Sequence, residues 1–72
     1  MKWNCEIIDH GNIYKANLTL NGRAVEGLPE YVGYHHLKRS IRERTGIRIT
    51  DRQDLAFEQR EMARYAYCEG EF

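Results

Sequence analysis

A chain of 72 residues is long enough for one small domain and too short for two. Its hydrophobic fraction of 42% excludes wholesale disorder, and its 11 basic and 11 acidic side chains cancel, unlike the basic excess of a dedicated nucleic-acid-binding domain. No run of residues approaches the ~20 apolar positions of a membrane span, and no apolar secretion signal opens the chain. We therefore expect one cytoplasmic domain over residues 1–72 that does not bind membranes, with residues 68–72 as a frayed tail.

The first third of the chain has the pattern of β-strands. Apolar and polar side chains alternate over residues 2–7 and again over 14–20, which is the period of a strand with one buried face. Turn-forming residues at 9–12 separate these two strands. Asn21-Gly22 is a pair that type I′ turns favour, so residues 23–26 are predicted to return as a third strand.

A helix is predicted to follow these strands. Pro29 suits the first turn of a helix, and Gly46 suits the left-handed conformation that ends one, so the helix is expected to run from Pro29 to about Thr45. The stripe that would face the core consists of Tyr34, Leu37 and Ile41.

The last third of the chain allows two interpretations. Residues 47–49 fit a short edge strand, and residues 50–53 have the form of a capping box. A second helix over residues 51–67 would place Leu55, Met62 and Ala66 on one face. The alternative is a hairpin, because residues 64–68 also fit a strand.

The sequence therefore predicts an α+β domain. It would contain a three-stranded antiparallel meander followed by two helices packed on one face, in the order βββα(β)α.

Charge is unevenly distributed along the chain. The net charge is −1 over residues 1–33, +4 over residues 34–52 and −3 over residues 53–72. Four residues of the predicted helix follow the spacing i, i+3, i+4 and i+7, which places them on one face: His35, Lys38, Arg39 and Arg42. Such a face can contact an acidic protein surface or nucleic-acid phosphates, and the alternative is a face that is merely solvated.

Two aromatic residues form a second candidate binding surface. On the second predicted helix, Phe57 and Tyr65 lie away from the inner face together with Cys68. Aromatic side chains rimmed by charge are typical of an interface centre, either with another protein or with a second copy of the chain. The alternative is that Phe57 packs against the first helix.

Metal binding and catalysis are not expected. Cys5 and Cys68 are 63 positions apart, and the adjacent His35 and His36 would point about 100° apart on a helix. Cys5 is expected to face the core as an inert thiol, and no disulfide with Cys68 is expected in a reducing cytosol. The sequence contains no phosphate-binding glycine motif and no nucleophile next to a base, so we expect no cofactor, no metal and no enzymatic activity.

These observations favour a small non-catalytic protein-binding module whose partner has an acidic surface. It would act as an adaptor or inhibitor of a larger assembly, since chains of this size without catalytic motifs are common among accessory proteins of phages and mobile elements. The alternative is a nucleic-acid-binding protein that uses the basic face of the first helix.

Overall fold

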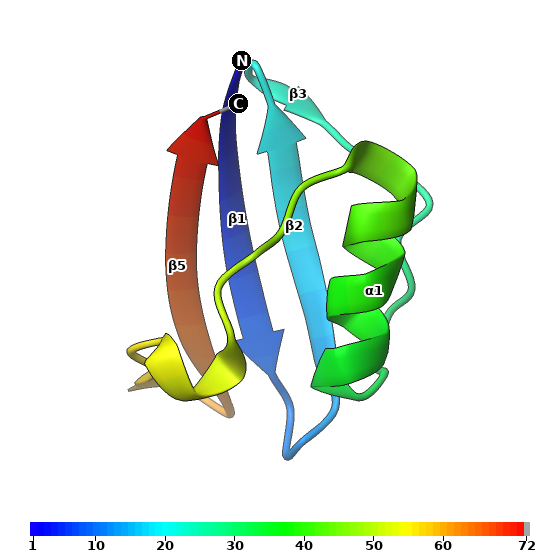
Figure 1. Cartoon of the computed structure of the whole chain (residues 1–72). Coiled ribbons are helices and arrows are strands. Elements are labelled where there is room, and N and C mark those ends of the chain that lie inside the picture. Colours follow the sequence, from blue (N-terminus) through cyan, green and yellow to red (C-terminus); the bar gives the residue numbers. More distant parts are fainter. Residues whose placement is uncertain (72) are drawn as a thin grey trace.

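The computed structural model describes residues 1–71 as a five-stranded antiparallel sheet with one α-helix against one of its faces (Figure 1). In chain order the elements are β1 (Lys2–Asp9), β2 (Tyr14–Leu20), β3 (Arg23–Ala24), α1 (Tyr34–Thr45), the 3₁₀ turn η1 (Arg52–Asp54), β4 (Glu58–Arg60) and β5 (Ala63–Glu71). The strand order in the sheet is β3-β2-β1-β5-β4, so the first strand of the chain lies at the centre. The predicted fold class, three strands with two helices, is therefore wrong.

The predicted meander of the first three strands forms one half of this sheet. β1 and β2 pair antiparallel, with Cys5 opposite Leu18. Asn21 and Gly22 have φ angles of 51° and 80°, the two positive values that a type I′ turn requires. The return strand β3 has only two residues, shorter than the predicted 23–26.

The helix starts later than Pro29. Tyr31 has a left-handed φ of 59°, and Val32 forms an isolated bridge with Tyr14, the first residue of β2. This bridge holds the chain extended up to Gly33, the N-cap of α1. The helix ends where predicted, because Gly46 takes the left-handed conformation with φ of 80° and donates its N–H to the Arg42 carbonyl.

The second helix, predicted over residues 51–67, does not exist. Its place is taken by η1 and the hairpin of β4 and β5, which was the alternative interpretation. β5 pairs with the whole length of β1, from Lys2 opposite Glu71 to Asp9 opposite Arg64. Residues 68–71 of the expected tail thus belong to β5, and Phe72 lies outside the described residues.

The helix predicted from the pattern does not form because residues 64–71 pair with the central strand β1 instead. Ala66 and Cys68 point into the core, and Tyr67 points to the opposite face and is 62% exposed. Met62, which the helix would have buried, is 93% exposed in the hairpin turn. The capping-box pattern produces a single 3₁₀ turn, and its N-cap Asp51 makes no side-chain capping bond.

Residues 47–49 do not form the predicted edge strand. The coil of residues 46–57, interrupted by η1, crosses the face of the sheet from the end of α1 over β2 and β1 towards β5 (Figure 1). Ile47 and Ile49 are each 2% exposed, so the coil covers the half of the sheet that α1 leaves open.

The core lies between the sheet and the layer made by α1 and this coil. Leu37 and Ile41 of α1 are fully buried, as the predicted stripe requires, and Tyr34 is half-buried. Ten buried residues make up the central cluster: Trp3, Cys5, Ile7, Tyr14, Leu18, Leu37, Ile41, Ile47, Ile49 and Cys68. No helix within residues 1–71 has the length and apolar character that crossing a membrane would need.

Candidate functional site

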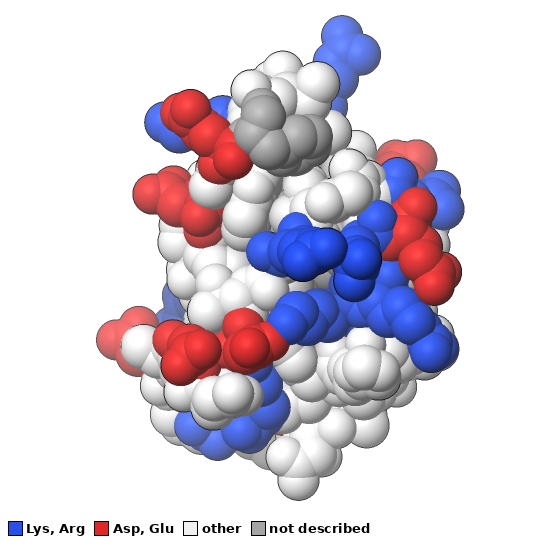
Figure 2. Space-filling model, viewed as in Figure 1, with Lys and Arg blue, Asp and Glu red and all other residues white. Residues whose placement is uncertain are grey.

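A basic hollow lies on the outer surface of the layer that α1 and the coil form over the sheet. Its lining comes from α1 and from the coil that follows, and it encloses about 320 Å³. We call this site the basic hollow, and its lining residues are His35, Lys38, Arg39, Arg42 and Arg48. Figure 2 shows Lys and Arg side chains gathered across the middle of this face.

The local fold explains why five separate residues converge there. Helical spacing places the four predicted residues on the side of α1 that does not contact the sheet. Arg48 is added by the coil, because Ile47 and Ile49 point into the core and the residue between them must point outward. Gly46 turns the chain back beside α1 and so brings Arg48 next to the helix.

Two of the cations are engaged with acidic side chains. Lys38 forms an ion pair and hydrogen bond with Asp51, and Arg39 Nε lies 4.0 Å from Glu43 Oε1. Within residues 1–71, Arg42 and Arg48 have no acidic partner, and both are exposed. The hollow can therefore accept an anionic group from outside, and guanidinium groups bind carboxylates and phosphates through paired hydrogen bonds.

The structure separates the two aromatic residues that the sequence placed together. Phe57 is half-buried, packs against Tyr14 with ring centroids 6.4 Å apart, and lies under the guanidinium groups of Arg52 and Arg64. Tyr65 points to the opposite face of the sheet, where the Arg60 guanidinium lies 4.3 Å from its ring centre. No common aromatic stripe exists, because the helix that would have carried it is absent.

A buried carboxylate that the sequence did not single out anchors the coil. Asp9 is 4% exposed, and its Oδ2 lies 3.7 Å from Arg52 and 3.9 Å from Arg64. Its Oδ1 accepts a hydrogen bond from the N–H of Asn12 at 2.7 Å. Arg52 also donates to the Tyr14 hydroxyl, which ties η1 to the turn between β1 and β2. Because its charges are paired within the fold, this cluster has a structural role.

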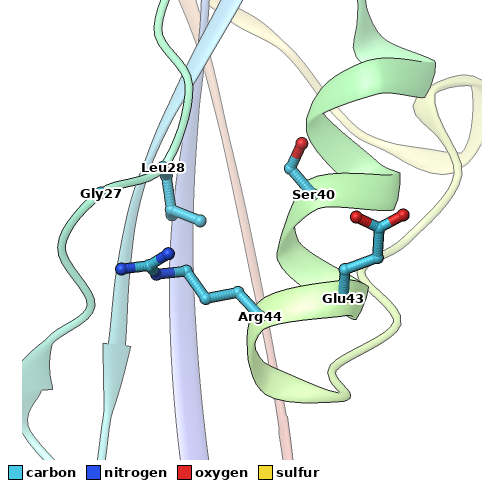
Figure 3. A pocket seen from close by; sticks show the side chains of 5 residues that line it. All are labelled: Gly27, Leu28, Ser40, Glu43 and Arg44. Carbon is cyan, nitrogen blue, oxygen red and sulfur yellow. The ribbon is translucent and has the colours of Figure 1, made fainter.

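A second hollow of about 330 Å³ lies between α1 and the loop before it, lined by Gly27, Leu28, Ser40, Glu43 and Arg44 (Figure 3). The Arg44 guanidinium packs on Gly27 so closely that a Cβ there would lie 2.6 Å from its Nη2. One cation and one anion line this hollow, so it has no net preference for a charged ligand.

The candidate metal ligands do not meet. Among residues 1–71, no three His, Cys, Asp or Glu side chains are grouped closely enough to hold a metal ion. Cys5 and Cys68, which the sequence separates by most of its length, are nevertheless direct neighbours on β1 and β5. Comparison of this chain with protein-family models, with curated proteins and with solved structures found no match.

Proposed function

We propose that this chain is a small non-catalytic protein-binding module that receives acidic side chains of a larger protein in the basic hollow. It would act as an adaptor or inhibitor of the assembly that contains that protein. The observation that carries this proposal is the convergence of four cations and a histidine on one hollow of about 320 Å³. Two of these cations, Arg42 and Arg48, have no acidic partner within residues 1–71.

The border of the hollow favours a protein over a nucleic acid. Glu43 and Asp51 lie beside it, paired with Arg39 and Lys38. Red side chains accordingly flank the blue ones in Figure 2. A nucleic-acid backbone is uniformly negative and would bring phosphates against these carboxylates. A protein surface can match the mixed pattern, with acidic groups over the hollow and basic or neutral groups over its border.

Surface charge alone gives modest affinity. An exposed ion pair contributes about 0.2–1 kcal/mol, because water screens the charges and ordering the side chains costs entropy. Several pairs formed together in one hollow, with partial removal of water, contribute more and also orient the partner. We therefore expect binding that weakens with ionic strength and depends on the two unpaired arginines.

The test reverses those two charges. Arg42→Glu with Arg48→Glu changes the hollow by four units of charge, and Lys2→Glu with Arg23→Glu makes the same change outside it. Both control residues are exposed. The partner is isolated from host extract on wild-type protein, and its dissociation constant is then measured for each variant. We expect at least about tenfold weaker binding for the hollow variant, the size of two or three lost charge pairs, and little change for the control.

Equal weakening by both variants would show that only net charge matters, and unchanged binding would show that the hollow is not the contact. A mixed-sequence DNA duplex is titrated in parallel. Binding of this duplex with a steep dependence on salt, lost in the hollow variant, would replace the protein partner with nucleic acid.

A further inference from the structure

Two cysteines face each other across the centre of the sheet. Cys5 of β1 and Cys68 of β5 are directly opposite in the antiparallel register. Both side chains point into the core, and their exposed fractions are 0% and 9%. Both are free thiols.

Their placement suits a disulfide. Directly opposite residues of an antiparallel pair have Cα atoms about 4.5–5.5 Å apart, and disulfides span Cα separations of about 4.4–6.8 Å. The two thiols lie close enough for each to shift the pKa of the other. Joining the sulfur atoms would therefore need little movement of either strand.

The surroundings make Cys68 the more reactive of the two. Hydrogen bonds from Cys5, and then from the backbone and hydroxyl of Thr50, lower the pKa of Cys68. The hydrogen bond to Cys68, followed by burial, raises the pKa of Cys5. Other titratable groups surround this pair. Glu6 of β1 raises the pKa of Cys5. Tyr34 of α1 lies next to both cysteines, and its own pKa is also raised by Asp51 of the coil and Tyr14 of β2. Cys68 is also the only one of the two with exposed surface, 9% against 0% for Cys5, so it is the thiol that a reagent reaches first. Its thiolate is the form that attacks disulfides.

We infer that Cys5 and Cys68 are a redox-active dithiol that a low-molecular-weight disulfide oxidises to a bridge between β1 and β5, reached by local opening of the coil of residues 46–57. The inference does not require any partner in the basic hollow, although Arg48 of that hollow lies in the same coil.

The reaction with oxidised glutathione proceeds by two exchanges. The Cys68 thiolate attacks one glutathione sulfur, the glutathione disulfide bond breaks, and one glutathione leaves as a thiolate that takes up a proton. Cys5 then loses its proton to solvent and attacks Cys68 Sγ, which forms the Cys5–Cys68 bond and releases the second glutathione. The two cysteines lose two hydrogens in total, and one glutathione disulfide becomes two glutathione thiols.

The coil controls access because it leaves only 9% of Cys68 exposed. Thr50 lies on Cys68, and the Tyr34 hydroxyl donates a hydrogen bond to the Thr50 carbonyl. The ion pair of Asp51 with Lys38 fastens the next residue to α1. A reagent the size of glutathione can reach Cys68 only when this part of the coil opens locally.

The first experiment uses the unmodified protein. It is incubated at neutral pH with oxidised and reduced glutathione, quenched with acid, alkylated and weighed by mass spectrometry, while circular dichroism monitors the fold. We expect a product that carries no alkyl group, weighs two hydrogens less than the reduced protein before alkylation, and has an unchanged circular dichroism spectrum. The Cys5→Ala variant should stop at a mixed disulfide with one glutathione. If the wild-type protein stays a dithiol, stops at the mixed disulfide, or oxidises only after its spectrum collapses, the inference is wrong.

The second experiment tests access with matched variants. Tyr34→Phe removes the hydroxyl that holds Thr50, and Tyr67→Phe removes a hydroxyl that bonds Asn4 on the opposite face of the sheet. Loss of one hydrogen bond favours opening about fivefold, so Tyr34→Phe should oxidise about fivefold faster than wild type. Tyr67→Phe should oxidise at the wild-type rate. Equal acceleration by the two variants would mean that oxidation follows global unfolding, which overturns the role of the coil.

Discussion

Leu18 shows how one side chain supports the whole fold. It lies in the middle of β2, opposite Cys5, and is 2% exposed beneath the layer of α1 and the coil. A domain of this size has little stability in reserve, because its core is small relative to its surface. The free-energy cost of burying a single unpaired charge at this position is therefore larger than the remaining contacts can offset.

We predict that Leu18→Asp unfolds the domain. Burial of an unpaired carboxylate costs more than the ~5 kcal/mol by which small domains are stable. The adjacent Thr19→Asp serves as the control, since Thr19 points to the solvated face of the sheet opposite Asn4. Circular dichroism and thermal melting should show a cooperative transition for Thr19→Asp and none for Leu18→Asp. A native-like transition in the Leu18 variant would contradict the register of β2.

Single residues also show how far the sequence defines the candidate site. The spacing of His35, Lys38, Arg39 and Arg42 was enough to place them on one side of α1, because helical geometry depends only on that spacing. Arg48 was missed, because its position depends on the path of a coil with no repeating pattern. The sequence did contain one indication of its direction. Ile47 and Ile49 are apolar and buried, so Arg48 between them points to solvent.

At the level of elements, the β4–β5 hairpin is held by long-range pairing rather than by its own turn. Arg60 pairs with Ala63, so Glu61 and Met62 form a two-residue turn. Glu61 has a left-handed φ of 54°, which costs a residue with a Cβ about 1–2 kcal/mol unless it is Asn or Asp. The turn sequence therefore opposes the hairpin, and the ladder between β5 and β1 compensates.

We predict that Glu61→Asn stabilises the domain by about 0.5–1 kcal/mol, because Asn tolerates the left-handed region. Urea unfolding followed by fluorescence of Trp3 measures the change. Glu58→Asn, which removes the same charge from β4 at an ordinary φ, should give no gain. Equal gains from both variants would indicate that the lost charge, and not the turn, is responsible.

The same hairpin explains why half of the fold could not be predicted from the sequence. Local signals identified β1, β2 and α1, because strand alternation, Asn21-Gly22 and Gly46 act within a few residues. Residues 51–67 carry the spacing of a helix and lack an Asn-Gly or Asp-Gly turn. Their true conformation depends on pairing with β1, some 60 positions away in sequence, and local patterns carry no information about that contact.

At the scale of the whole molecule, the sheet has an order that the chain order conceals. The strands lie as β3-β2-β1-β5-β4, and three of the four neighbouring pairs in this row are strands that follow one another in the chain. The exception is the pairing of β1 with β5, which joins the two ends of the chain. Lys2 lies opposite Glu71, and the N- and C-terminal ends are side by side in Figure 1.

A circular permutant should therefore fold faster than the natural chain. A glycine–serine linker of about five residues would join the ends, and new ends would be opened between Glu26 and Gly27, two exposed residues outside the strands. The strands then follow one another as β4, β5, β1, β2 and β3, so every neighbouring pair in the sheet becomes a local hairpin. Folding rates rise as contacts become more local, because less loop-closure entropy is lost before the strands pair. Stopped-flow refolding from urea should give a larger rate constant for the permutant, with circular dichroism confirming the same fold.

A control permutant opened between Gly11 and Asn12 exchanges one distant pairing for another, since it separates β1 from β2, and should show no such gain. Equal rates for the two permutants would show that pairing of β1 with β5 does not limit folding.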